Sequence, residues 1–256
     1  MKPRLSYIIC TTPRSGSWML CSLLWQTGIA GRPSEFFGPT PWEEFRSNRN
    51  LARAKDVSEY MDQVVAVSMT ANGVFGTKLI ANQTHQFLRR ATEHRGRPLI
   101  SLREALEAEY PGLRYVLLTR ENKVAQAISY YRSVMTGVWQ SRSHILASDA
   151  ALVYDHYALE RCYQDSAISD AYWEGFFRTH GIEPLRLTYE ALTADFEGEA
   201  RRVLRYLDLP TDTPIASPQT VKLADDISRE WEERFRRDGR FPAEPHLDPQ
   251  SLWAPY

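Results

Sequence analysis

The sequence predicts an α/β fold in which helices cover both faces of a central parallel sheet. Short apolar runs rich in β-branched and aromatic residues recur along the 256 residues, and segments with helical periodicity separate them. These runs are apolar through their middle, which is typical of strands buried on both faces. The first run also leads through a tight polar turn into an apolar helix, a common arrangement at the ligand-binding edge of such sheets. We therefore expect a sheet of four or five strands between two helical layers.

Four apolar runs are expected to form the strands: Leu5–Thr12, Gly73–Ile80, Leu113–Arg120 and Ile182–Glu190. The segment "SYIICT" in the first run is too apolar for an edge strand, so we expect this strand inside the sheet. Strands joined by helices run parallel, and their carboxyl ends meet at one edge, where ligands bind.

Helices are expected between and after these strands. The segment "SWMLCSLLWQTG" is apolar nearly all round and ends at Gly28, which indicates a buried helix with a glycine C-cap. The last helical segment interleaves Glu and Arg and is expected to be a solvated face. The other helical patterns, with this last one, cover Trp42–Arg53, Asp56–Ala71, Ala81–Arg95, Ser101–Gly112, Glu121–Met135, a stretch from a cap at Ser148 or Asp149 to about His180, Ala194–Leu209 and Val221–Gly239.

The composition is that of an ordinary globular protein, with 43% apolar and 25% charged residues, and we expect a single domain over residues 1–256. The formal net charge is -1, so no global field recruits nucleic acid or anionic membrane, and any anion site must be local. The three cysteines are expected to be buried thiols in a reducing compartment. No segment is long enough to span a bilayer, and we expect a cytoplasmic protein.

The turn "PRSGS" at Pro13–Ser17 is typical of a phosphate cradle. It follows a strand and precedes a helix, so its backbone N–H groups and the helix N-terminus would face an anion. It is not the ATP-type loop G-x-x-x-x-G-K-[ST], because it has no first glycine and no Gly-Lys pair. The turn predicts a P-loop-type three-layer fold that binds a phosphate-like group other than the triphosphate of an NTPase.

A second candidate anion site consists of Arg120, which ends the third strand, and Ser129 on the helix that follows. A guanidinium fork and a hydroxyl donor suit one phosphate. Taken alone, this pair is better explained as a surface ion pair and a serine on a solvated face. Together with Pro13–Ser17, it fits a ligand that carries two separated phosphate-like groups.

Several longer blocks resemble, in this order, the bacterial trehalose 2-sulfotransferase family: "TTPRSGSWML", "TGIAGRPSEFF", "GVFGTKL", "LRYVLLTRENKVAQAISYYRS" and "ADDISREWEERF". The resemblance covers nearly the whole chain. It implies an enzyme that moves a sulfuryl group from 3′-phosphoadenosine 5′-phosphosulfate (PAPS) to a hydroxyl of a carbohydrate or glycolipid acceptor, trehalose-like, with 3′,5′-ADP as product. It also implies a homodimer.

Carried over by position, the resemblance assigns two sets of donor contacts. The residues implied to grip the 5′-phosphosulfate are Arg14, Ser15, Gly16, Ser17 and Trp18. Arg120 and Ser129 match the positions that hold the 3′-phosphate, and Lys222, near the start of the last helix, is a candidate for the same phosphate.

The resemblance places the general base of the family at Glu35, in "GRPSEFF". Sulfuryl transfer needs a base for the acceptor's hydroxyl proton, and it needs cations to stabilise charge on the leaving oxygen, the role expected of Arg14. Beside Phe36 and Phe37, the carboxylate is expected to have its pKa raised toward neutrality, which would improve it as a base. A solvated loop glutamate is the alternative on the sequence alone.

Acceptor contacts are also expected at Phe37, at Lys78 near the end of the second strand, at Trp139 as a platform for a sugar ring, and at His144. Each has a plainer explanation, such as a lysine in water, a buried loop aromatic or a solvated histidine. The six histidines show no ligand spacing such as H-E-x-x-H, so no metal site is expected.

Two other functions remain open on the sequence alone. A P-loop small-molecule kinase should carry Gly-Lys-Ser/Thr and a magnesium-binding acid at a strand end, and neither is evident. A non-catalytic nucleotide-binding module should lack the base or the cradle. The loops at residues 29–42 and 136–148 are expected to select the acceptor.

Overall fold

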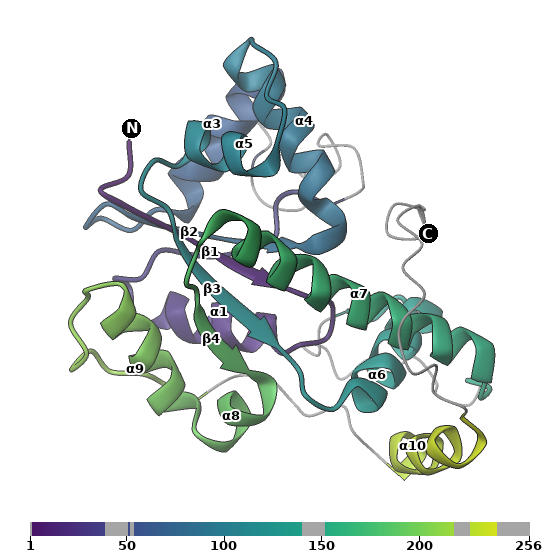
Figure 1. The fold of residues 1–256 in the computed structure, drawn as a ribbon. Helices are drawn as coiled ribbons and strands as arrows, with labels where there is room; N and C mark the ends of the chain where they lie inside the picture. The colour runs from purple at the N-terminus through teal and green to yellow at the C-terminus, as the bar shows by residue number, and fades with distance from the viewer. Residues whose placement is uncertain (1, 39–50, 52–53, 140–151, 218–225, 240–256) are drawn as a thin grey trace.

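A computed structural model describes residues 2–38, 51, 54–139, 152–217 and 226–239, and its centre is a parallel sheet of four strands (Figure 1). The strands are β1 (Leu5–Thr11), β2 (Val74–Ile80), β3 (Arg114–Thr119) and β4 (Leu185–Thr188). They lie in the order β2-β1-β3-β4, and every neighbouring pair is parallel. The α/β class and the parallel sheet predicted from the sequence are confirmed.

β1 lies inside the sheet between β2 and β3, as its apolar sequence predicts. Every residue of β1 after Leu5 is buried. β2 is also buried along its whole length, and its outer side is met by an isolated parallel bridge between Glu35 and Lys78. The segment that carries Glu35 is therefore fixed against the sheet near the end of β2.

One face of the sheet packs against four helices: α3 (Val57–Ser68), α4 (Thr84–Arg95), α5 (Leu102–Glu109) and α7 (His156–His180). A short 3-10 helix, η1 (Ala81–Gln83), joins β2 to α4. Trp173 of α7 and Phe87 of α4 are fully buried in this layer together with Phe75 of β2. α7 thus packs across the sheet as well as against its neighbouring helices.

The opposite face packs against α1 (Ser17–Gln26) and α9 (Phe196–Tyr206), and the short α8 (Tyr189–Ala194) precedes α9. Along β1, Tyr7 and Ile9 point to this face while Ile8 and Cys10 point to the other. Both faces of β1 are therefore apolar, which explains its uninterrupted hydrophobic sequence.

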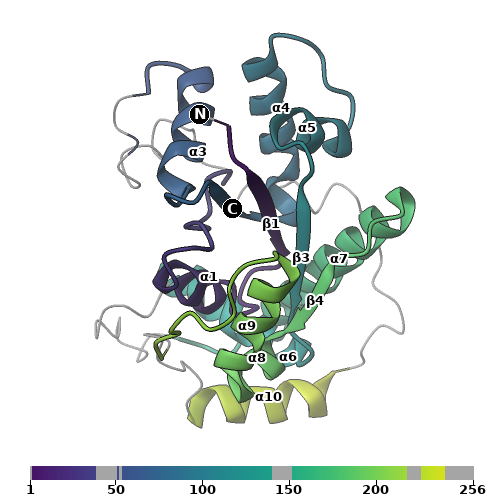
Figure 2. The same ribbon diagram turned by 90° about the vertical axis from the view of Figure 1, so that its left-hand side faces the viewer.

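A third apolar cluster joins α6 (Lys123–Thr136), the first part of α7 and α10 (Asp226–Asp238), which runs below α6 in Figure 2. Trp231 and Phe235 of α10 are buried, and the ring of Trp231 lies 5.9 Å from that of Tyr131 on α6. The prediction that α10 presents only a solvated face is wrong for these two residues. Their spacing of four places both on one side of the helix.

The start of α7 also differs from the prediction of a cap at residues 148–149. The helix begins at His156, and the side chain of Asp155 accepts a hydrogen bond from the backbone of the first turn. Residues 152–155 are not helical, and the hydroxyl of Tyr131 donates to the carbonyl of Val153 at 3.0 Å, whereas residues 148–149 lie outside the described residues.

The expected helix Trp42–Arg53 falls almost entirely outside the described residues, as do residues 221–225 of the expected last helix. Within the described parts of the chain, no helix combines the length and the apolar character that crossing a membrane requires.

Candidate active site

The carboxyl ends of the strands bring the polar residues singled out in the sequence to one edge of the sheet. The loop at residues 12–16 follows β1, near the centre of the sheet. Arg120 follows β3 on one side of this loop, and Lys78 lies near the end of β2 on the other. Tyr189 begins α8 directly after β4. The loop therefore stands between two cationic side chains.

The loop between β1 and α1 has the backbone shape of an anion cradle. Arg14 and Gly16 have φ angles of 62° and 83°, in the left-handed region. Gly16 is the N-cap of α1 and has no side chain to occupy the first-turn N–H groups, which stay available to an anion. The buried hydroxyl of Ser15 lies 2.6 Å from that of Thr11, which donates to the carbonyl of Leu118 at 2.9 Å. Ser15 therefore fastens the loop to the sheet.

Gly16 lies under the ring of Tyr189. A Cβ atom at Gly16 would be 2.6 Å from Cδ2 of Tyr189, closer than real Cβ contacts come. Only glycine combines this close approach with a φ of 83° at no steric cost.

Replacing Gly16 with alanine is expected to lower the unfolding temperature and to weaken the binding of 3′,5′-ADP, because strain of about 1–3 kcal/mol falls on the cradle itself. Gly28→Ala is the matched control, since Gly28 also has a positive φ, of 68°, but a Cβ there meets nothing within 4 Å. Thermal unfolding and nucleotide titration of both variants check this. Equal nucleotide affinity in the two variants would contradict it.

Two guanidinium groups approach each other beside the cradle. Arg120 Nη1 donates to the carbonyl of Arg14 at 3.3 Å, and the Arg120 guanidinium stacks on the ring of Tyr189, 4.4 Å from its centroid. The Nε atom of Arg120 is buried and has no hydrogen-bond partner among the described residues. A buried donor without a partner is costly, so a ligand oxygen at this position would stabilise the site.

The electrostatics of the two arginines favour an anion. Burial in the first place, and the charge of Arg120 in the second, lower the pKa of Arg14 to about 10. Burial also lowers the pKa of Arg120, against the opposing effects of Tyr189, Glu190 and Glu232. Both groups remain cations near neutral pH, and an anion bound between them would offset their desolvation and mutual repulsion.

Ser129 and Trp139 both contact Arg14. The Nε atom of Arg14 donates to the hydroxyl of Ser129 at 2.9 Å, and Nη1 donates to the carbonyl of Trp139 at 2.5 Å. The contact that the structure gives Ser129 is therefore with the loop arginine, whereas the sequence pairs Ser129 with Arg120. The side chain of Trp139 is half exposed and packs against Tyr130, with ring centroids 6.0 Å apart.

The carboxylate of Glu35 lies between a cation and an amide. Lys78 Nζ is 2.8 Å from Oε2, and Gln83 Nε2 donates to Oε1 at 2.6 Å. The backbone N–H of Lys78 also donates to the carbonyl of Ser34 at 2.9 Å, which fixes this segment on β2. The side chain of Glu35 is 25% exposed, so a substrate hydroxyl can reach it. These contacts hold the carboxylate in one orientation.

The two phenylalanines expected beside Glu35 belong to the hydrophobic core. Phe36 and Phe37 are 3% and 0% exposed, and the ring of Phe37 packs edge-on against Phe87 with centroids 4.9 Å apart. These two rings enter the core, where they bury apolar area, while Glu35 stays at the strand ends. Phe37 therefore has no exposed surface for an acceptor and supports the loop from below.

The remaining predicted site residues divide into two groups. Ser17 is buried at the start of α1, and Trp18 is partly buried with its ring edge-on to that of Trp25, 5.8 Å away. His144 and Lys222 lie outside the described residues.

Two residues at the site were missed in the sequence. Gln83, which holds Glu35, and Tyr189, which lies over Gly16 and Arg120, both follow a strand at the same edge of the sheet. Their signal was their position, since the carboxyl ends of parallel strands converge on the ligand site. In the part of the chain that the structure describes, no three His, Cys, Asp or Glu side chains are grouped to hold a metal ion.

Comparison with known proteins finds relatives in sequence and, separately, a solved structure with the same fold. Trehalose 2-sulfotransferase from Mycolicibacterium smegmatis is 30% identical over 261 residues, covering 92% of this chain and 96% of that protein. Trehalose 2-sulfotransferase from Mycobacterium tuberculosis is 28% identical over 255 residues, covering 91% and 94%. The solved sulfotransferase domain of the Synechococcus PCC 7002 olefin synthase shares the fold, with a TM-score of 0.51 at 16% identity over 98% of this chain and 94% of that one.

The family-level match spans the strands and helices that build the site. Residues 6–238 match the Stf0 sulphotransferase family, and this range contains the cradle, both arginines, Glu35 and Lys78. The chain is a sulfotransferase that belongs to the Stf0 sulphotransferase family.

Proposed function

We propose that this sulfotransferase moves a sulfuryl group from PAPS to a hydroxyl of a trehalose-type carbohydrate or glycolipid. The observation that carries the proposal is the partly buried pair Arg14 and Arg120, which flanks a glycine cradle and includes a buried guanidinium Nε with no partner among the described residues. Two cations beside one cradle fit a nucleotide with phosphate groups on both sides of its ribose. PAPS is such a nucleotide.

The 5′-phosphosulfate would bind at the loop, where Arg14 and the backbone N–H groups at the start of α1 meet. These donors would stabilise the charge that develops on the bridging oxygen when the sulfur–oxygen bond breaks. The 3′-phosphate would bind at Arg120, whose Nε would then gain a partner. Ser129 would hold Arg14 between the two groups.

Glu35 would act as the general base from the opposite side of the loop. The sheet order β2-β1-β3 supports this, because Glu35 and Lys78 belong to the β2 side and Arg120 to the β3 side. An acceptor hydroxyl at Glu35 would then attack the sulfur from the side away from the nucleotide, as an in-line displacement requires. Its proton passes to the carboxylate, a new sulfur–oxygen bond forms, and 3′,5′-ADP leaves.

The carbohydrate acceptor is supported by two independent observations. The two mycobacterial relatives are both described as trehalose 2-sulfotransferases. The backbone carbonyl of Trp139 accepts a hydrogen bond from Arg14, and its half-exposed ring, which packs against Tyr130, offers an amphipathic aromatic surface near the cradle. We therefore propose that Trp139 contacts the acceptor.

The donor is tested by thermal unfolding with PAPS, 3′,5′-ADP, and ATP with magnesium. PAPS and 3′,5′-ADP carry phosphate on both sides of the ribose and can engage both Arg14 and Arg120, so they should raise the unfolding temperature far more than ATP, which has no 3′-phosphate. A kinase would show the reverse order. Incubation with labelled PAPS and a panel of sugars and glycolipids, followed by mass spectrometry, then identifies the acceptor, and a nucleotide-binding module would yield no sulfated product.

A further inference from the structure

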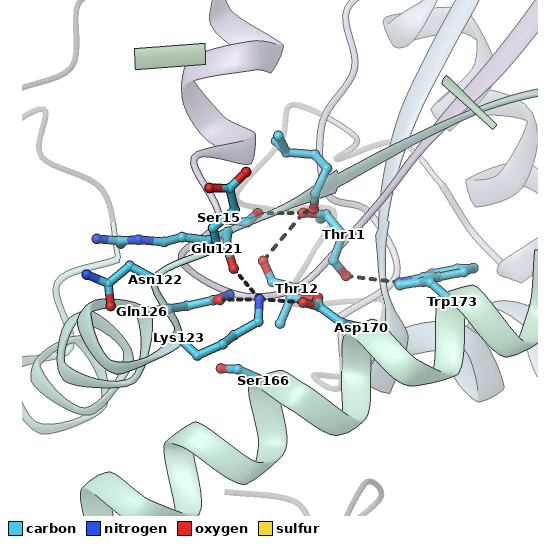
Figure 3. A network of polar contacts seen from close by, with 12 residues as sticks. Thr11, Thr12, Ser15, Glu121, Asn122, Lys123, Gln126, Ser166, Asp170 and Trp173 are labelled. Atoms are coloured by element: carbon cyan, nitrogen blue, oxygen red, sulfur yellow. Dashed lines mark hydrogen bonds and ion pairs between the residues drawn. The ribbon is translucent and has the colours of Figure 1, made fainter. Parts of the chain in front are cut away.

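A network of largely buried polar contacts lies directly beneath the cradle (Figure 3). Its centre is Lys123, the first residue of α6, whose ammonium group donates to Gln126 Oε1 at 3.0 Å and contacts both the carbonyl of Arg120 and the carboxylate of Asp170. An ammonium group has three N–H donors, so these three acceptors use all of them. Lys123 thus joins the end of β3 to α7.

The α7 side of the network reaches the loop itself. Asp170 accepts a hydrogen bond from the hydroxyl of Thr12 at 2.6 Å, and Trp173 Nε1 donates to the carbonyl of Thr11 at 3.1 Å. Residues 170 and 173 lie on one side of the helix, as their spacing requires. One face of α7 therefore fixes the last residue of β1 and the first residue of the loop.

Two carbonyls of the loop accept hydrogen bonds from side chains that follow β3. Gln126 Nε2 donates to the carbonyl of Pro13 at 2.7 Å, and Arg120 Nη1 donates to that of Arg14 at 3.3 Å. In a planar trans peptide the carbonyl and the following N–H point in opposite directions. Side chains that hold these two carbonyls therefore also fix the orientation of the N–H groups of Arg14 and Ser15 in the loop.

The ion pair between Lys123 and Asp170 carries a desolvation cost. The two side chains are only 19% and 18% exposed, and burying both charges costs solvation that an apolar pair would not lose. Stability alone therefore explains the pair poorly. What an apolar pair lacks is the set of directed contacts that joins the Arg120 carbonyl to Thr12.

We propose that Lys123 is a positioning residue for the sulfuryl donor. Lys123 fixes the position of Arg120 relative to the cradle, because it contacts the Arg120 carbonyl and, through Asp170, the loop at Thr12. The inference rests on the proposed donor site, since it assigns the two held segments to the two phosphate groups of the donor. Lys123 also neutralises Asp170, whose carboxylate would otherwise repel an anion bound in the loop.

The test compares Lys123→Met and Asp170→Asn with wild type. The dissociation constant of 3′,5′-ADP, the KM values of PAPS and of the acceptor, kcat and the unfolding temperature are measured for each. Lys123→Met is expected to raise the 3′,5′-ADP dissociation constant and the PAPS KM by about 10- to 100-fold, with little change in the acceptor KM. Asp170→Asn should raise these two constants less, because its amide oxygen still accepts the hydrogen bond from Thr12 and the freed ammonium of Lys123 attracts an anion.

Arg95→Met is the matched control. Arg95 forms an ion pair with the buried carboxylate of Glu109 at 2.8 Å, between α4 and α5 and away from the site. This variant loses an ion pair to a buried carboxylate as well, so it can lower the unfolding temperature, but its KM values should match wild type. A split between PAPS KM and acceptor KM in Lys123→Met alone is what a merely structural role would not produce.

Each outcome decides the inference. A Lys123→Met dissociation constant within about twofold of wild type overturns it, as does a loss confined to the unfolding temperature and kcat. If the wild-type protein does not bind 3′,5′-ADP, the proposed donor site is wrong, and the inference that rests on it is wrong as well. If Lys123→Met does not fold, the double variant with Asp170→Asn removes both charges, and wild-type affinity in that protein overturns the inference.

Discussion

Glu35→Gln is expected to lower kcat by about 10²–10⁴-fold while the affinity for 3′,5′-ADP stays nearly unchanged. Glutamine keeps the shape of the side chain and can still accept the hydrogen bond from Gln83, but it cannot take the acceptor's proton near neutral pH. The acidic limb of the kcat profile should also disappear, because that limb reports protonation of the base. Steady-state kinetics against pH and nucleotide titration measure both effects.

The competing role for Glu35 is to position an acceptor hydroxyl without taking its proton. In that case the glutamine variant retains much of kcat, and the loss falls mainly on the acceptor KM. A simultaneous loss of donor and acceptor binding would mean that Glu35 only supports its loop through Lys78. Glu104→Gln is the control, since Glu104 pairs with Arg97 at 2.7 Å away from the strand ends and should leave all constants unchanged.

The sheet could be predicted from the sequence because each strand has one dominant physical cause. The segment from Leu5 to Thr11 is buried on both faces, so burial alone dictates an apolar run at that place. The turn that follows is equally local, since Gly16 needs its φ whatever lies elsewhere in the chain. The positions of the cradle and of Arg120 at one edge then follow from the parallel order of the strands.

The partners of the site residues could not be predicted, because they come from distant segments. Gln83 holds Glu35 across 48 positions of the sequence, and Asp170 holds Thr12 across 158. No local pattern distinguishes these side chains from ordinary solvated ones. Phe37 follows Glu35 in the sequence, yet its side chain is fully buried in the core, which the sequence does not show.

Two other differences, the buried residues of α10 and the start of α7, do have a local signal in the sequence. Trp231 and Phe235 are four residues apart in a strongly charged helix, and that spacing is typical of a narrow buried stripe. Asp155 is as good an N-cap as the residues at 148–149, and in the structure its side chain accepts the hydrogen bond at the start of α7.

Arg120→Met is expected to weaken the binding of 3′,5′-ADP by about 1.5–3 kcal/mol, or about 10- to 150-fold, and to weaken the binding of 5′-AMP much less. The physical reason is the buried Nε, which has no partner among the described residues and would bind the 3′-phosphate that only the first nucleotide carries. Methionine keeps much of the side-chain volume against the ring of Tyr189. Calorimetric titration of both nucleotides against wild type and variant measures the difference.

Arg120 also holds the carbonyl of Arg14, so part of any loss can come from the cradle and not from the 3′-phosphate. The two nucleotides separate these contributions. A disturbed cradle lowers the affinity for both nucleotides equally, whereas a lost 3′-phosphate contact lowers only the affinity for 3′,5′-ADP. Ser129→Ala serves as the second arm: it removes the contact to Arg14 Nε at 2.9 Å and leaves the Arg120 guanidinium in place. That variant should lower the affinity for both nucleotides by similar factors. If Arg120→Met behaves like Ser129→Ala, Arg120 shapes the loop and does not read the 3′-phosphate, and the donor's second phosphate must be held elsewhere.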